Sequence, residues 1–296
     1  MRLGLFTDAF PERPLGEVLD WLAAELPALR DVEVGTGGYS PAPHCDRAAL
    51  LASASARDEW LGAIAERGFR LAALNASGNP LEVPEHERAL RETIRLAALL
   101  GVDAVVCMSG GRPELAGGAW FPGVEDEVER YWRERVLPAW RELSALAQAE
   151  RESLRLCLEL EPGSAAYTVS TALRLCEACP NVRVNLDPSH FFWQGVDPLA
   201  AVRALGDRIG FAHGKDTVLD EQRVAVDGLL DRTAWRYATA GHGHGEGWWR
   251  AFADELRREG YDGVLSIEWE DALVPPAESV LEAALLLERL LVEVPA

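Results

Sequence analysis

The chain has 296 residues and a formal net charge of −19, from 29 lysines and arginines against 48 aspartates and glutamates. So large an acidic excess argues against a nucleic-acid partner, because phosphate binding needs a basic surface. No run of about 18 apolar residues suggests a membrane-spanning helix, and Asp8 interrupts the first apolar stretch, so we expect no signal peptide. Five cysteines, an odd number, do not suggest a disulfide scaffold. We therefore expect a reduced, cytoplasmic protein without a membrane partner.

One pattern repeats along the chain: a short apolar run precedes an amphipathic stretch with helical periodicity. The apolar runs predict strands at Leu3–Thr7, Val32–Gly35, Phe69–Leu74, Ala104–Met108, Leu154–Leu158, Val182–Leu186, Ile209–Ala212 and Val264–Ile267. The stretches between them predict helices near 15–27, 47–67, 85–100, 125–151, 169–179, 198–206, 247–259 and 277–293. Eight such alternations predict an α/β fold with a closed parallel sheet, a (β/α)8 TIM barrel.

We expect this barrel to be a single domain over residues 1–296, because no Pro-, Gly- or Ser-rich linker divides the chain. The longest stretch expected to be irregular is 214–246, after the seventh strand. A loop of that length in a compact domain is usually functional or disordered. In a barrel of this kind the loops after the strands build the active site.

Four consecutive predicted strands end in a carboxylate or an imidazole, and these side chains are Glu159, Asp187, His213 and Glu268. Adjacent strand ends converge on one mouth of a closed barrel. Mixed oxygen and nitrogen ligands suit Mn²⁺, Mg²⁺, Fe²⁺, Co²⁺ or Zn²⁺. Three close carboxylates would repel one another without a cation. We therefore predict one divalent metal ion on these four residues, with Mn²⁺ as the first choice.

Two further glutamates compete for these positions. Glu161 and Glu270 lie two residues beyond Glu159 and Glu268, and alternate residues of a strand share a face. We prefer the residue that ends each apolar run, and assign Glu161 to substrate binding.

Other polar and aromatic residues near the predicted mouth are candidates for substrate binding. His190 could be a fifth ligand, a structural histidine or a substrate contact, and we favour the last. Lys215 could bind a substrate oxygen or lie in solvent. Trp193 could offer a flat face to a sugar or belong to the core. His244, in the stretch GHGHGEGWW (241–249), is expected to order the long loop beside the metal and to lie near the substrate.

Two weaker signals remain open. Cys176 and Cys179 form a lone C-x-x-C, for which two part-buried thiols are a better interpretation than a zinc or redox site. A phosphate group could find a basic cluster of residues from predicted loops, namely Lys215, Arg112, Arg232 and Arg236. Since the protein is very acidic, we expect an unphosphorylated or already oxidised sugar instead.

The chain resembles the sugar phosphate isomerase/epimerase family, the xylose isomerase-like TIM barrels, over nearly its whole length. The matching pieces are VEVGTGGYSPAPHC (32–45), ALNASGNPL (73–81), LELEPG (158–163), NLDPSHFFWQGVDP (185–198), AHGKD (212–216), GHGHGEGWW (241–249) and GYDGVLSIEWED (260–271). The resemblance implies a small-molecule carbohydrate substrate and a divalent metal on the same four residues. It also implies that Glu159 and Glu268 are the catalytic residues that move the proton.

Such a site would polarise a sugar carbonyl, remove the proton from the neighbouring carbon and return it through a metal-stabilised enediolate. We therefore predict a metal-dependent sugar isomerase or epimerase. A metal-dependent lyase or hydrolase acting on oxidised glycosides, and a carbohydrate-binding barrel without catalysis, are the alternatives. The subunit count is open, a homo-oligomer included.

Overall fold

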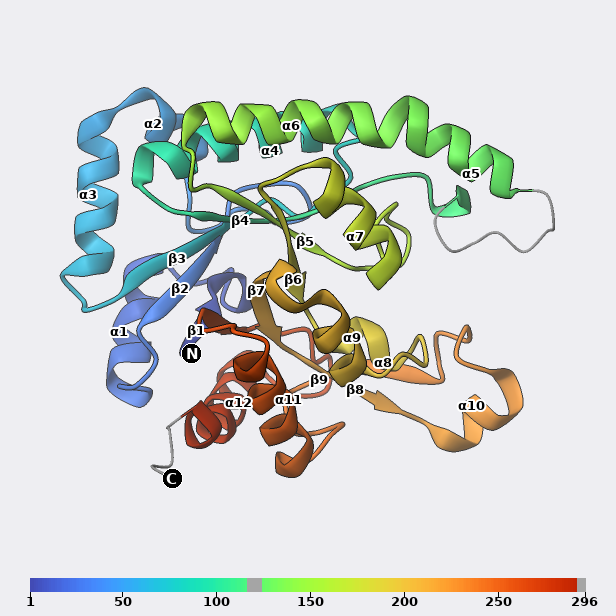
Figure 1. Cartoon of the computed structure of the whole chain (residues 1–296). Helices are drawn as coiled ribbons and strands as arrows, with labels where there is room; N and C mark the ends of the chain where they lie inside the picture. The colour runs from blue at the N-terminus through green and yellow to red at the C-terminus, as the bar shows by residue number, and fades with distance from the viewer. Residues whose placement is uncertain (116–123, 292–296) are drawn as a thin grey trace.

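A closed barrel of parallel strands forms the centre of the computed structural model, which describes residues 1–115 and 124–291. Within these residues eight strands follow one another around the barrel in the order β1-β10-β7-β6-β5-β4-β3-β2, and helices cover the outside (Figure 1). The barrel strands are β1 (Arg2–Phe6), β2 (Asp31–Gly35), β3 (Arg70–Asn75), β4 (Ala104–Met108), β5 (Arg155–Glu159), β6 (Val182–Leu186), β7 (Ile209–Gly214) and β10 (Val264–Ile267). The predicted fold is confirmed, and each predicted strand end lies within two residues of the observed one.

The helices alternate with the strands as predicted. They are α1 (Leu15–Glu25), α2 (Arg47–Ala52), α3 (Ala54–Ala65), α4 (Pro84–Leu100), α5 (Glu125–Tyr131), α6 (Leu137–Glu150), α7 (Val169–Ala178), α8 (Ser189–Phe192), α9 (Pro198–Leu205), α10 (Glu221–Asp227), α11 (Glu246–Arg258) and α12 (Pro276–Leu291). Short 3-10 turns lie at Thr7–Ala9, Pro113–Leu115 and Gly206–Arg208. The end predicted at residue 293 for the last helix lies outside the described residues.

Local sequence explains how α4 begins and ends. Pro84 stands in its first turn, where a missing N–H costs nothing. The stripe that includes Leu90, Ile94 and Ala97 is fully buried, as its spacing predicts. The helix stops at Gly101, whose left-handed φ of 73° suits glycine.

Two predicted helices are each interrupted. The helix expected over 47–67 is two helices, because Ser53 adopts an extended conformation and its side chain accepts the N–H of Ala56 as the cap of α3. The helix expected over 125–151 contains a wider, π-helical turn at Trp132–Val136 between α5 and α6. Pro138 follows this turn and cannot donate a hydrogen bond to the preceding turn, which accounts for the irregularity.

The interior of the barrel changes from apolar to polar along its axis. At the amino-terminal end of the strands a small cluster of buried side chains fills it: Ala73, Ala104, Val106, Cys157, Phe211 and Val264. At the carboxyl end the buried side chains are polar, and they include Glu33, Asn75, Glu159, Asn185 and His213. A separate, larger apolar cluster packs the helices onto the outside of the barrel. The polar end is where the candidate site lies.

The stretch expected to be irregular, 214–246, contains regular structure. Strands β8 (Asp216–Leu219) and β9 (Trp235–Ala238) pair in antiparallel register, with Asp216 opposite Ala238. Helix α10 connects them and lies at the outer edge of the molecule in Figure 1. The two strands, DTVL and WRYA, lack the apolar run that predicted the barrel strands.

Asp216 fixes the glycine- and histidine-rich loop beside this hairpin. It is fully buried, and its Oδ2 atom accepts the backbone N–H groups of Gly241, Gly243 and His244 at 2.9–3.1 Å. The indole N–H of Trp249 donates to the same oxygen at 3.2 Å. One carboxylate oxygen therefore binds three backbone N–H groups of this loop and one indole N–H.

The described helices include none with the length and apolar character that a membrane crossing requires. All five cysteines are buried free thiols, as expected for a chain without disulfides. Cys176 and Cys179 are both fully buried, more than the part-buried pair predicted.

Asp216→Asn is expected to lower the free energy of unfolding by about 1–3 kcal/mol, because an amide cannot accept all of these donors. Urea unfolding measures the loss, and hydrogen exchange should quicken at residues 241–244. Asp220→Asn is the matched control: Asp220 caps α10 through Gln222 and Arg223, and asparagine caps a helix equally well. Equal losses in the two variants would contradict this role of Asp216.

Candidate metal centre

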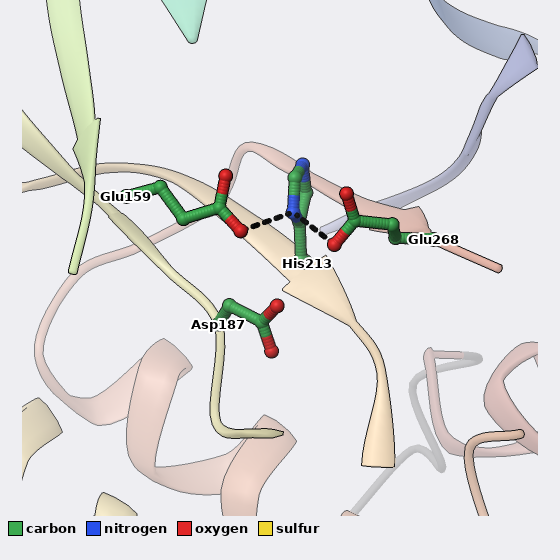
Figure 2. A group of neighbouring side chains, drawn as sticks. All are labelled: Glu159, Asp187, His213 and Glu268. Atoms are coloured by element: carbon green, nitrogen blue, oxygen red, sulfur yellow. Dashed lines mark hydrogen bonds and ion pairs between the residues drawn. The ribbon is translucent and has the colours of Figure 1, made fainter. Parts of the chain in front are cut away.

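Four side chains with metal-ligating atoms meet where four neighbouring barrel strands end. Glu159 is the last residue of β5, Asp187 follows β6, His213 lies in β7, and Glu268 follows β10. Each offers one nitrogen or oxygen atom, and these atoms lie within 4.8 Å of one another. Figure 2 shows the two glutamates on opposite sides of the His213 ring, with Asp187 beside them. The structure thus brings together the four residues proposed as ligands from the sequence.

Strand alternation explains why these side chains point inward. Cys157 and Phe211 belong to the apolar cluster inside the barrel, and Glu159 and His213 stand two residues beyond them. Successive side chains of a strand point to opposite faces, so residues two apart share the interior. The intervening Leu158 packs in the outer cluster.

Glu33 holds the His213 ring from the side opposite the two glutamates. This carboxylate is buried in β2, and its Oε2 atom lies 3.0 Å from Nε2 of His213. Asn75 and Ser266 donate to the Glu33 carboxylate at 2.7 and 2.8 Å. The other ring nitrogen, Nδ1, lies 3.1 Å from Oε2 of Glu268 and 3.9 Å from Oε1 of Glu159. A carboxylate at one nitrogen fixes the ring and leaves the other nitrogen toward the site.

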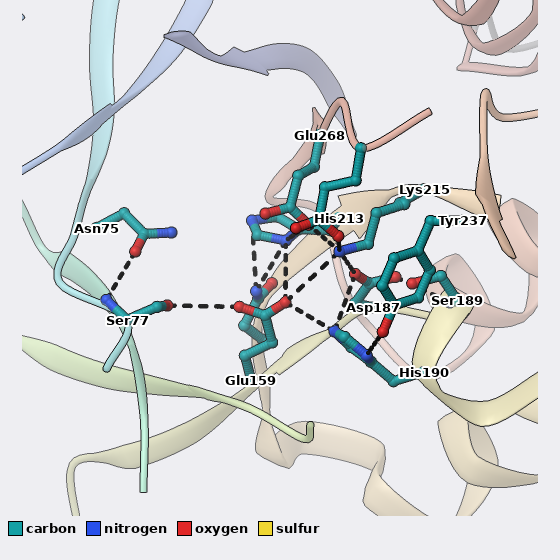
Figure 3. A network of polar contacts seen from close by, with 12 residues as sticks. Asn75, Ser77, Glu159, Asp187, Ser189, His190, His213, Lys215, Tyr237 and Glu268 are labelled. Atoms are coloured by element: carbon teal, nitrogen blue, oxygen red, sulfur yellow. Dashed lines mark hydrogen bonds and ion pairs between the residues drawn. The ribbon is translucent and has the colours of Figure 1, made fainter. Parts of the chain in front are cut away.

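Lys215 lies inside this acidic cluster and not in solvent. Its side chain is 1% exposed, and Nζ lies 2.6 Å from Glu268 and 3.1 Å from Asp187 (Figure 3). Glu270 lies 2.7 Å from the same nitrogen. Burial disfavours the charged ammonium, but the carboxylates of Asp187, Glu268 and Glu270 hold the pKa of Lys215 well above its usual value. The residue therefore carries a fixed positive charge at the site.

The two glutamates of the cluster are stabilised in their ionised forms. Burial and the neighbouring Glu268 oppose ionisation of Glu159, but a hydrogen bond from His190 and the charges of His213 and Lys215 lower its pKa. Burial likewise opposes ionisation of Glu268, whose pKa Lys215 and His213 hold well below its ordinary value. Both carboxylates can therefore act as ligands or bases.

His190 connects Glu159 to the β8–β9 hairpin. Its Nε2 atom lies 2.9 Å from Oε1 of Glu159, and its Nδ1 atom lies 2.9 Å from the hydroxyl of Tyr237 (Figure 3). Tyr237 belongs to β9, and the ammonium of Lys215 lies 4.6 Å from the centre of its ring. When the tyrosine donates to Nδ1, the imidazole hydrogen on Nε2 donates to Glu159.

The chemistry of the cluster fits a divalent cation. Three carboxylates and one imidazole are ligands that first-row transition ions and Mg²⁺ accept. The Oδ2 atom of Asp187 is buried and accepts no hydrogen bond from the described residues, although Lys215 pairs with it at 3.1 Å. Its neighbours are this ammonium and, at 3.5 Å, Nε2 of His190. A divalent cation at this point would add the positive charge that three close carboxylates need.

A cavity of about 500 Å³ opens above the cluster. Its walls come from the last residues of the strands and from the segments that follow them: Phe6, Asp8, Ala9, Tyr39, Ser40, Pro41, Asn75, Ser77, Met108, Glu159, Glu161, His190, Lys215, Glu268, Trp269 and Glu270. Glu161, His190 and Lys215, three of the predicted substrate-binding residues, are among them. The cavity has room for a small sugar.

The other two predicted substrate-binding residues lie outside these walls. Trp193 stacks on Trp235, with ring centres 4.5 Å apart. His244 stacks on Phe192 at 3.7 Å, and its Nδ1 atom lies 2.7 Å from Asp216. Both support the hairpin and the loop that border the site.

Sequence reasoning did not identify Glu33 or Tyr237. Glu33 could have been found, because it lies within a predicted strand, VEVG (32–35), whose side chains are expected to be buried. A glutamate is buried there only when other polar or charged groups pair with it. Nothing in the sequence around Tyr237 marks its contact with His190, which depends on the position of the hairpin.

Comparison with known proteins places this chain in a family. A family model described as a xylose isomerase-like TIM barrel matches residues 32–290. The uncharacterized protein YfiH of Bacillus subtilis (strain 168) is 35% identical over 303 residues, which cover 95% of this chain and 96% of YfiH.

Solved structures share the fold at much lower identity. The 3-keto-D-glucoside 4-epimerase YcjR of E. coli, in its apo form, has a TM-score of 0.66 and 17% identity, with 98% of each chain covered. The IolI protein, solved with a bound zinc atom, has a TM-score of 0.69 and 18% identity over 98% of each chain. The match of the family model and the similarity to YfiH show that the chain belongs to the xylose isomerase-like TIM barrel family.

Proposed function

We propose that the protein is a divalent-metal-dependent sugar isomerase or epimerase. The observation that carries this proposal is the arrangement of Glu159 and Glu268. These two ionised carboxylates face each other across the point where Asp187 and His213 also converge, at the floor of a cavity of about 500 Å³. That YcjR is an epimerase and that IolI binds zinc support the proposal.

The residues that would hold the cation are Glu159, Asp187, His213 and Glu268. A bound divalent cation would polarise a carbonyl and so acidify the neighbouring C–H group. Glu33 would keep Nδ1 of His213 directed at the cation, since Glu33 occupies the opposite ring nitrogen.

The chain's own groups would then move one proton. One glutamate takes the proton from the carbon beside the carbonyl, and the electron pair of the broken C–H bond forms the enediolate double bond. The other glutamate supplies a proton and regenerates a carbonyl. A proton returned to the opposite face of the same carbon gives epimerisation, and a proton returned to the neighbouring carbon gives isomerisation.

His190 and Lys215 tune these two glutamates differently. His190 lies 2.9 Å from Oε1 of Glu159, while Ser77 lies 3.4 Å from its other oxygen. Lys215 lies 2.6 Å from Glu268, where a positive charge favours the ionised form. Each glutamate therefore has its own partner to orient it.

Asp187→Asn is expected to weaken Mn²⁺ binding by at least about 100-fold, because it removes one charged ligand. Isothermal titration of the wild-type protein should show one Mn²⁺ per chain. Glu161→Gln and Glu270→Gln should keep that stoichiometry. Loss of the metal in either of these two variants would show that the ligating glutamates were assigned wrongly.

The wild-type protein loaded with Mn²⁺ is expected to wash deuterium into a ketose or aldose at the carbon beside the carbonyl. Glu159→Gln and Glu268→Gln should lower the exchange rate by about 10²–10⁴-fold, since each removes a proton-transfer group. Nuclear magnetic resonance in D₂O measures the exchange, with metal content determined for each variant.

Glu152→Gln is the control for these measurements, because Glu152 is exposed just before β5, at the opposite end of that strand from Glu159. This variant should exchange deuterium into the sugar at the wild-type rate. Absence of exchange with every sugar, or release of an alcohol in its place, would contradict the isomerase proposal.

Glu33→Gln is expected to weaken Mn²⁺ binding by about 10- to 100-fold although Glu33 is not a ligand, because the His213 ring loses its fixed orientation. Competition with a fluorescent chelator measures the affinity. Circular dichroism should show an unchanged fold. Wild-type affinity in this variant would mean that Glu33 has no part in positioning the histidine.

A further inference from the structure

The walls of the cavity carry a strong excess of acidic groups. Five lining residues are carboxylic acids, namely Asp8, Glu159, Glu161, Glu268 and Glu270, and Asp187 adds a sixth carboxyl group at the floor. Against them stand the ammonium group of Lys215 and the imidazole of His190, whose two nitrogens already face Glu159 and Tyr237. A divalent cation and Lys215 would together balance the three carboxylates of the ligand cluster, and the acidic groups of Asp8, Glu161 and Glu270 would remain in excess around a substrate.

The single ammonium group is already engaged. Lys215 lies within 3.1 Å of Asp187, Glu268 and Glu270 (Figure 3). The described residues that line the cavity include no arginine. A phosphate or carboxylate on a substrate would therefore find no free cationic side chain among them.

The arginines that could have formed a phosphate site are held elsewhere. Arg112 pairs with Glu82 at 3.3 Å, and Arg236 pairs with Asp271 at 3.1 Å. Arg232 lies over the ring of Trp235 at 4.7 Å. None of the three belongs to the cavity walls, so the basic cluster considered from the sequence does not form there.

Glu161 and Glu270 are the two lining glutamates that stand outside the ligand cluster. Each lies two residues beyond a proposed ligand, past the end of its strand, and lines the cavity. Within the described part of the chain the Glu161 side chain makes no hydrogen bond or ion pair. Glu270 is bound through Oε2 to Lys215 and is 47% exposed. Both glutamates have oxygen atoms available to accept hydrogen bonds.

We propose that the cavity selects an uncharged polyhydroxy substrate and rejects sugar phosphates and sugar acids. Hydroxyl groups distant from the metal would donate to Glu161 and Glu270, because a carboxylate accepts two neighbouring hydroxyls well. Anionic groups would meet like charges, which costs affinity. This inference rests on the proposed function for the identity of the site and deepens it by naming the substrate class.

Matched pairs of sugars test the inference: D-fructose with D-fructose 6-phosphate, and D-ribulose with D-ribulose 5-phosphate. Titration calorimetry on the Mn²⁺-loaded protein should show the uncharged member of a pair binding at least about tenfold more tightly. In Glu161→Gln and Glu270→Gln the uncharged sugar should bind more weakly, and the preference should shrink by about tenfold. Glu152→Gln removes the same charge from an exposed site and should change neither value.

Deuterium exchange with the same pairs separates this inference from the proposed function. Faster exchange into a phosphorylated sugar than into its uncharged partner would overturn the inference and leave the isomerase proposal standing. If no sugar binds or exchanges, the proposed function fails, and inorganic phosphate then serves as the probe. Saturable thermal stabilisation by phosphate of the Glu161→Gln/Glu270→Gln double variant alone would support the charge selection. Stabilisation of the wild type, or of neither protein, would contradict it.

Discussion

Repulsion among buried carboxylates is the constraint on which the rest of the site depends. Glu159, Asp187 and Glu268 offer oxygens within 4.8 Å of one another and of the His213 ring. Charges this close repel strongly in a medium of low dielectric unless positive charge is near. Lys215, which is 1% exposed, supplies part of that positive charge. We propose that a divalent cation supplies the remaining positive charge. The same acidic cluster would then hold the ion that the proposed reaction needs.

The barrel satisfies this constraint through its packing. Small and apolar side chains fill its interior at the amino-terminal end, and the next inward-facing positions along the same strands are polar. The outer helices hold the strands in register, while Glu33 and Asp216 fix a histidine and a loop by hydrogen bonds to charged oxygens. The ends of the strands therefore place the four proposed ligands, and the segments that follow the strands complete the cavity walls.

The sequence predicted the helices and strands that hydrophobic periodicity marks. It missed features that depend on single side-chain hydrogen bonds or on tertiary contacts. The ends of the apolar runs indicated Glu159 and His213 as candidate ligands, because polar residues at the ends of barrel strands meet at one mouth. The break at Ser53 and the contact of Tyr237 with His190 depend on single side-chain hydrogen bonds, which periodicity does not record. The β8–β9 hairpin was missed because its short strands, DTVL and WRYA, lack the apolar run that marks the barrel strands. The sequence left open whether Lys215 lies in solvent, because its burial depends on the carboxylates that surround it.

The central claim is that one divalent cation binds where these four strand ends meet. An anomalous difference map from crystals grown with Mn²⁺ tests it most directly, since the signal identifies the metal and its position together. The account predicts one anomalous peak within bonding distance of Glu159, Asp187, His213 and Glu268. The Lys215 ammonium should lie beside the ion and not at its position. A map without a peak at this point, or with the peak bonded to Glu161 and Glu270 in place of Glu159 and Glu268, would contradict it.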